Sequence, residues 1–159
     1  MTETPSDRLA RQLALATPAL LLGGALVSQY GFGLYPCEMC MWQRYPHYAA
    51  IGLALLASFA QPRRLWTAAA AFAILVSGAI GLFHAGVEYG WWEGITGCAL
   101  TADTSGADAL EAIMNAPLVR CDAPAWTFLG ISLAGWNFLI STASGLAIFW
   151  LLARGGKRA

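Results

Sequence analysis

The chain has 159 residues, of which 58% are hydrophobic and only 11% charged, and its nine basic and nine acidic side chains cancel. Soluble globular domains carry about 25% charged residues, so most of this surface is not suited to water. A net charge of zero gives no electrostatic footprint for nucleic acid. The length allows one domain, which in a bilayer means about four spans of roughly 20 residues each.

Four apolar stretches match this length, and we expect each to cross about 30 Å of hydrocarbon as a helix. The first is interpreted as a retained anchor, because its apolar core is longer than that of a signal peptide. The second is the least apolar, because Arg44, Pro46 and His47 lie near its start. The expected spans are residues 13–32, 41–60, 65–87 and 126–152.

The basic residues set the expected orientation. Seven of the nine lie before the first span, between the second and third, or after the fourth, so an even number of spans puts them all on one side. The positive-inside rule makes that side the cytoplasm, which then holds both termini. The segment 88–125 faces outward as a long loop, and its six acidic residues and one arginine give it a net charge of −5.

Small residues recur within the spans, as in Ala68–Ala71 and Ser77–Gly81, and they let membrane helices approach closely. We therefore predict an all-α membrane protein, a bundle of four transmembrane helices in a single domain covering residues 1–159. In the outer loop, residues 109–114 could form a short helix with one apolar face. This helix either lies on the membrane surface or covers the bundle as an ordinary loop helix.

Four cysteines lie on the outer side or at its boundary. Cys37 and Cys40 form a Cys-x-x-Cys motif at the start of the second span, and Cys98 and Cys121 lie in the outer loop. Disulfides persist in oxidising compartments, so both pairs suit thiol redox chemistry. Two alternatives are a structural membrane protein with inert disulfides and a metal-handling protein that uses Cys37 and Cys40. The wide spacing of the second pair, without a nearby histidine, disfavours zinc, and we predict no metal site.

The surroundings of Cys40 favour a reactive thiolate. A helix N-terminus and a neighbouring cation stabilise a thiolate, and Arg44 follows Cys40 by four residues, on the same helical face. Glu38 acts in the opposite direction, and Arg44 could instead be an interface cation that extends to the head groups. Pro46 leaves two geometries open: the regular helix starts near Tyr45, or the span kinks at Pro46.

A histidine and a glutamate lie at the outer end of the third span. His84 and Glu88 are four residues apart, so a helix places them on one face. An ionisable residue near membrane depth indicates a functional site by default, although His84 could also be packed between helices and bonded to a backbone carbonyl. His47 could be an interface residue, and we leave it outside the predicted site.

The chain offers few ways to hold an electron acceptor. It has no Gly-x-Gly-x-x-Gly motif for a dinucleotide and no Cys-x-x-Cys-His motif for haem attachment. Its two histidines and four cysteines leave little to bind an iron centre. A membrane-dissolved quinone needs only an apolar slot with a few polar groups for its carbonyls, and Arg44 and His84 can supply such groups.

These motifs together resemble the disulfide bond formation protein B (DsbB) family, over nearly the whole chain. The resemblance implies an enzyme of the bacterial inner membrane that reoxidises a soluble periplasmic dithiol protein of thioredoxin fold, similar to DsbA. It also implies that the electrons pass to the quinone pool, as ubiquinone or menaquinone, and that the outer loop is periplasmic. The residues that carry the resemblance are Cys37, Cys40, Arg44, His84, Glu88, Cys98 and Cys121.

The resemblance implies a role for each cysteine. Cys98 is attacked by the reduced soluble protein, and Cys121 is its partner in the loop disulfide. Cys121 then reaches Cys37 in the Cys37–Cys40 disulfide, and Cys40 faces the quinone.

Four further residues are implied to bind the quinone. Arg44 stabilises the developing negative charge, and His84 lies nearby. Gln43 stands where some relatives carry a glutamate. Glu88 stands where the best-known member has a glutamine, which leaves its role open.

Overall fold

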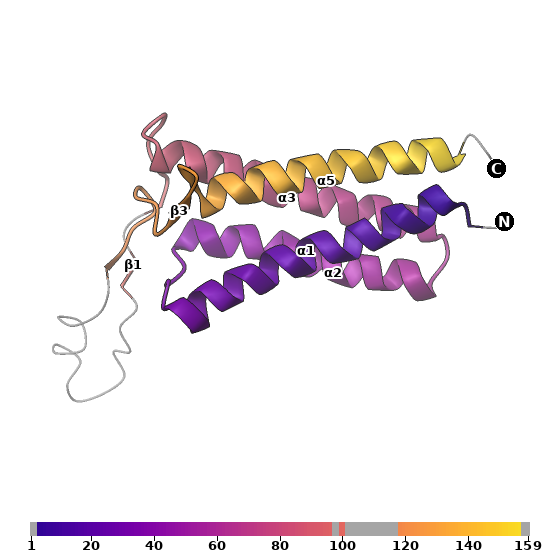
Figure 1. Ribbon diagram of the computed structural model, residues 1–159, viewed down its shortest axis with the longest axis horizontal. Helices are drawn as coiled ribbons and strands as arrows, with labels where there is room; N and C mark the ends of the chain where they lie inside the picture. The colour runs from indigo at the N-terminus through magenta and orange to yellow at the C-terminus, as the bar shows by residue number, and fades with distance from the viewer. Residues whose placement is uncertain (1–2, 97–98, 101–117, 157–159) are drawn as a thin grey trace.

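The computed structural model describes residues 3–96, 99–100 and 118–156. Four long helices pack side by side with their axes roughly aligned (Figure 1). Successive helices run in opposite directions, so α1 begins and α5 ends at the same end of the bundle. The helices are α1 (Pro5–Phe32), α2 (Glu38–Phe59), α3 (Arg63–Glu88) and α5 (Leu133–Gly156).

Three of these helices, α1, α3 and α5, are long and apolar enough to cross a membrane. The shorter α2 is not among them, and its first half carries Glu38, Arg44 and His47. The predicted all-α fold is confirmed, while the fourth membrane crossing stays a prediction. The short helix expected at residues 109–114 lies outside the described residues.

Two short antiparallel hairpins lie at the end of the bundle where α3 ends and α5 begins (Figure 1). In the first, β1 (Ala99–Leu100) pairs with β2 (Leu118–Val119), and in the second, β3 (Thr127–Phe128) pairs with β4 (Ile131–Ser132). The second hairpin turns at Leu129 and Gly130, which both have positive φ, as two-residue hairpin turns often do. This hairpin explains why α5 begins at Leu133 and not near Trp126, where the fourth span was expected.

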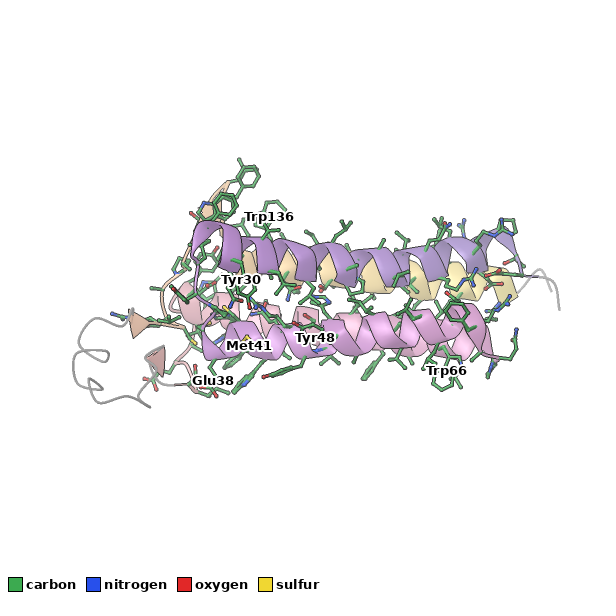
Figure 2. All side chains as sticks on the ribbon, turned by 90° about the horizontal axis from the view of Figure 1, so that it is seen from below. Tyr30, Glu38, Met41, Tyr48, Trp66 and Trp136 are labelled. Atoms are coloured by element: carbon green, nitrogen blue, oxygen red, sulfur yellow. The ribbon has the colours of Figure 1, made fainter. Side chains whose placement is uncertain are left out.

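The core of the bundle is made mainly of small side chains, while large apolar side chains point outward (Figure 2). Alanine lets neighbouring helices approach closely. An exposed apolar belt is unusual on a soluble monomer and suits a lipid environment. Fully buried residues include Ala10, Ala14, Ala50, Ala54, Ala70, Ala71, Ile74 and Ile148, and exposed ones include Leu20, Val27, Leu55, Phe72, Leu146 and Trp150.

Charged residues gather at the end of the bundle where α1 begins and α5 ends. Arg64 Nη1 lies 3.0 Å from Asp7 Oδ1, and Arg64 Nη2 donates to the backbone carbonyl of Leu152. Arg11 pairs with Glu3 at 3.1 Å. The Cys-x-x-Cys motif lies at the opposite end, where α2 begins, next to the residues Glu38 and Met41 labelled in Figure 2.

Gly81 allows the close approach of α3 and α5, and its substitution tests this contact. A Cβ atom at Gly81 would lie 2.9 Å from the carbonyl oxygen of Ala134 and 3.0 Å from the backbone nitrogen of Phe138. Backbone atoms cannot move aside alone, so Gly81→Ala is expected to separate the helices and to cost about 1–3 kcal/mol of stability. The measurement is thermal unfolding of the purified protein in detergent.

Gly52 provides the matched control, because a Cβ atom there meets nothing within 4 Å. Gly52→Ala is expected to keep or raise the unfolding temperature, since alanine favours a helix over glycine. Equal unfolding temperatures for the two variants would contradict the close packing at Gly81.

Candidate functional site

Cys37 caps the N-terminus of α2, and Cys40 lies in its first turn. The Cys37 sulfur accepts a hydrogen bond from the Cys40 backbone nitrogen at 3.2 Å, and the two sulfurs lie 2.8 Å apart as free thiols. Of the two geometries that Pro46 left open, the helix start near Tyr45 is wrong, because α2 begins at Glu38 and continues through Pro46. The kink at Pro46 stays a prediction. The motif therefore lies where the helix dipole favours a thiolate.

Cys37 retains its proton in this arrangement. Its thiol donates a hydrogen bond to the sulfur of Cys40, and this bond, together with burial, raises the pKa of Cys37 above its usual value. Negative charge in the reduced pair therefore develops on Cys40, the sulfur nearer to Arg44 in sequence.

A third cysteine and a histidine complete a buried cluster around Cys37. The sulfurs of Cys37 and Cys121 and a ring nitrogen of His84 all lie within 4.8 Å of one another. Cys121 is only 5% exposed, although it belongs to the long connection between α3 and α5. Cys98 lies outside the described residues. The structure thus brings one cysteine of the loop pair to the Cys-x-x-Cys motif, at Cys37.

The same three residues are of the kinds that bind zinc, two thiols and an imidazole. The geometry therefore fits either sulfur exchange or metal binding at this point. A metal site requires bound metal in the purified protein, whereas sulfur exchange does not.

Gln43 fixes the position of the proton on His84. Its Nε2 lies 3.2 Å from the carbonyl oxygen of Met39 and 2.8 Å from Nδ1 of His84. The carbonyl can only accept, so the Gln43 atom that faces both partners is the donating amide nitrogen. His84 Nδ1 therefore accepts, and the neutral ring carries its proton on Nε2. This Nε2 lies 3.5 Å from the sulfur of Cys37.

Glu88 extends the cluster by one turn of α3. Its Oε1 lies 3.7 Å from Nε2 of His84, as the four-residue spacing predicts, and its side chain is 6% exposed. The second carboxylate oxygen is buried without a hydrogen-bond partner among the described residues. Glu88 thus contacts the imidazole on the side of the sulfurs.

A cavity of about 260 Å³ lies beside Cys40, between α1, α2 and α5. Gln43 and Arg44 line it together with Cys40, whereas His84 and Glu88 do not. The four predicted quinone-binding residues therefore form two groups, one at the cavity and one at the sulfurs. The remaining wall is mostly apolar and includes Leu20, Leu21, Leu34, Tyr35, Leu133, Ala134 and Trp136.

Arg44 is buried at this cavity and has no carboxylate partner among the residues that the structure describes. It is 8% exposed, and its guanidinium donates to Oε1 of Gln29 at 2.6 Å and to the carbonyl of Ala25 at 3.3 Å. None of the ion pairs within the described part of the chain includes it. Its positive charge is therefore balanced only by neutral acceptors and remains available to a thiolate or a polar ligand.

A second half of the polar network was not predicted from the sequence. Asn137 Nδ2 donates to the side-chain oxygen Oε1 of Gln43 at 2.8 Å, and Ser77 Oγ donates to the backbone carbonyl of Gln43, also at 2.8 Å. His47, left outside the predicted site, lies 3.0 Å from Oδ1 of Asn137. Polar side chains inside apolar spans are costly, and this could have marked Asn137 as a site residue.

Comparison with known proteins gives the family. The profile of the family described as disulfide bond formation protein DsbB matches residues 7–152. The chain belongs to the DsbB family. The resemblance inferred from the motifs is thus confirmed, and with it a membrane family of disulfide-generating proteins.

Several curated relatives carry the name disulfide bond formation protein B. The protein from Verminephrobacter eiseniae is 36% identical over 96% of this chain and 89% of the relative. Those from Acidovorax sp. and Paracidovorax citrulli are 32% and 33% identical, over 99% and 94% of this chain and 93% and 90% of the relatives. No solved structure matches the chain.

A double variant tests the position of Cys121 next to Cys37. Cys40→Ser with Cys98→Ser leaves one sulfur of each pair. Since the Cys37 and Cys121 sulfurs lie within 4.8 Å and a disulfide needs about 2.05 Å, a small movement joins them. We expect a mild oxidant to link Cys37 to Cys121 in most molecules, as measured by mass spectrometry of alkylated peptides.

The matched control is Cys37→Ser with Cys98→Ser, which leaves Cys40 and Cys121. Because Cys40 is not part of the three-residue cluster, this variant is expected to form clearly less disulfide. The same yield in both double variants would contradict the contact between Cys121 and Cys37.

Proposed function

We propose that this DsbB-family chain is a protein-dithiol:quinone oxidoreductase of the bacterial inner membrane. It reoxidises a periplasmic DsbA-like protein and passes the electrons to ubiquinone or menaquinone. The observation that carries the proposal is the position of the Cys37–Cys40 pair between two kinds of surroundings. On one side Cys37 meets Cys121 and His84, and on the other Cys40 lines an apolar cavity with Arg44.

The proposed topology has four membrane crossings, α2 included, with both termini in the cytoplasm. The positive-inside rule supports it, because basic residues gather at the bundle end opposite Cys37, in contact with Glu3 and Asp7. The cysteines then lie on the periplasmic side. That compartment is oxidising, as disulfide chemistry requires.

Electrons enter through exchange at the loop disulfide. A thiolate of the soluble partner attacks Cys98 of a Cys98–Cys121 disulfide, which forms a mixed disulfide and releases Cys121 as a thiolate. The second thiolate of the partner then displaces Cys98. The partner leaves with a disulfide, and the loop pair holds the two electrons.

The next exchange moves the electrons to the Cys-x-x-Cys pair. The Cys121 thiolate attacks the sulfur of Cys37, and Cys40 leaves as a thiolate. Cys98 then displaces Cys37 from Cys121, which restores the loop disulfide. The Nε2–H group of His84 faces the Cys37 sulfur at 3.5 Å and stabilises the charge that appears there during its displacement.

The cavity beside Cys40 fits the ring of a quinone. Its volume of about 260 Å³ and apolar wall suit a flat ring, and Arg44 supplies donors for an oxygen atom. A quinone bound there supplies an acceptor for two electrons and two protons, and the Cys37–Cys40 disulfide re-forms as they leave. The charge of Arg44 stabilises the Cys40 thiolate before transfer and the negative charge that develops in the cavity.

Two site variants and one control test this function. Quinone reduction driven by a reduced thioredoxin-fold protein is expected to vanish in Cys40→Ser, because no sulfur faces the cavity. In Arg44→Ala it is expected to fall at least about tenfold, as when a charge-stabilising donor is removed. The quinone absorbance measures the rate. Arg63→Ala, at the other end of the bundle, is expected to keep it.

Each rival function gives a different outcome. Unchanged turnover in both site variants would contradict the proposal and favour a structural protein with inert disulfides. One equivalent of metal in the purified protein, found by elemental analysis, would favour metal handling at Cys37, His84 and Cys121.

A further inference from the structure

His47 is a second buried histidine, and it lies at the cavity. Its side chain is only 3% exposed and forms part of the cavity wall together with Cys40, Gln43 and Arg44. It follows Gln43 by one turn of α2, so the two side chains share a face of the helix. The role described above for His84, at the sulfurs, does not extend to this residue.

The orientation of Asn137 is fixed by a backbone carbonyl. Its Nδ2 lies 3.2 Å from the carbonyl oxygen of Ser77 and 2.8 Å from Oε1 of Gln43, two atoms that can only accept. This atom is therefore the amide nitrogen. The carbonyl atom Oδ1 then faces Nε2 of His47, at 3.0 Å.

Ser77 also acts as an acceptor towards His47. Its single hydroxyl proton is donated to the backbone carbonyl of Gln43 at 2.8 Å. Its Oγ can therefore only accept a hydrogen bond from Nε2 of His47, 3.0 Å away. Both neighbours of Nε2 are thus acceptors, and Nε2 carries the proton. The neutral ring of His47 has a bare lone pair on Nδ1.

This Nδ1 atom is buried and has no hydrogen-bond partner among the described residues. Buried polar atoms are nearly always paired, and an unpaired one calls for an explanation, such as a function in binding. Here the unpaired acceptor belongs to a side chain of the cavity wall. The ligand that suits it carries a donor next to an apolar ring.

We propose that Nδ1 of His47 accepts a hydrogen bond from a hydroxyl group of bound hydroquinone, and that the cavity therefore prefers the reduced form of the ring. The inference rests on the proposed quinone function and adds a specificity-determining residue to it. A quinone has only carbonyl acceptors, which cannot pair with a lone pair, whereas a hydroquinone has two O–H donors.

Arg44 and His47 then form different hydrogen bonds to the bound ring. Arg44 has only donors and pairs with an oxygen atom of either form, while His47 pairs with the reduced form alone. A tenfold preference for the hydroquinone raises the reduction potential of the bound ring by about 30 mV, since it is a two-electron couple. Electron transfer from Cys37 and Cys40 thereby proceeds further towards the disulfide.

Binding of the two forms of a short-chain benzoquinone tests the proposal. The full-length protein in detergent carries Cys37→Ser and Cys40→Ser, so that no electrons move, and quenching of tryptophan fluorescence reports binding under anaerobic conditions. Trp136 lies in the cavity wall as a reporter. Adding His47→Phe is expected to weaken hydroquinone binding about tenfold and to leave quinone binding within about twofold.

His47→Gln is the conservative control. Its amide can donate to Asn137 and Ser77 in place of Nε2 and retains an acceptor oxygen, so we expect it to keep most of the preference for the hydroquinone. An equal loss for both forms in His47→Phe, or no loss for either, overturns the inference.

A spectroscopic measurement on the chain with Cys37→Ser and Cys40→Ser, which retains His47 and moves no electrons, does not depend on whether His47→Phe folds. The chain has two histidines, so ¹⁵N labelling of imidazole gives four nitrogen signals, which His47→Gln assigns. The Nδ1 signal of His47 is expected to shift with the hydroquinone and not with the quinone. A shift with neither form, or the same shift with both, overturns the inference.

The outcomes separate this inference from the proposed function. Binding of neither form to the protein that retains His47 contradicts both. Binding of both forms that His47→Phe leaves unchanged overturns only the role of His47, and the cavity remains a quinone site.

Discussion

The side-chain amide of Gln43 joins the two halves of the site. Its nitrogen donates to His84 on α3, and its oxygen accepts from Asn137 on α5, each at 2.8 Å. One residue of α2 thereby sets both the imidazole next to the sulfurs and the polar group next to His47. In a bundle core of alanine, without competing water, each such bond is strong and each lost partner is costly. A glutamate at this position would accept at both oxygens, and the His84 proton would then move to Nδ1.

In the bundle around this amide, small side chains lie inside and large apolar side chains lie outside. Alanines between the helices let their backbones approach, and glycines such as Gly81 and Gly145 remove even the Cβ atom at helix contacts. Large apolar side chains cover the outside. Such a core has little room to adjust, so the rotation of each helix fixes which polar residues meet. This rigidity matters for a site whose hydrogen bonds come from all four helices.

The sequence was informative where spacing alone determines geometry. The Cys-x-x-Cys motif, the four-residue spacing of His84 and Glu88, and the four apolar segments all follow from local periodicity. What could not be read was the rotation of the helices about their axes. That rotation decides that Arg44 lies at the cavity while His84 lies at the sulfurs, and that Asn137 of a distant helix meets His47. The hairpin before α5 was also missed, because its turn at Leu129 uses a conformation that leucine rarely adopts.

The separation of the two cysteine contacts gives the proposed relay its direction. Cys121 approaches the sulfur of Cys37, and the cavity lies against Cys40, so an electron pair from the loop can reach the cavity only through the pair on α2. The proton arrangement agrees with this order. Cys37 retains its proton through its bond to Cys40, so charge collects on Cys40. The sulfur that carries the charge is therefore the one beside Arg44, and the sulfur that carries the proton is the one that Cys121 can reach.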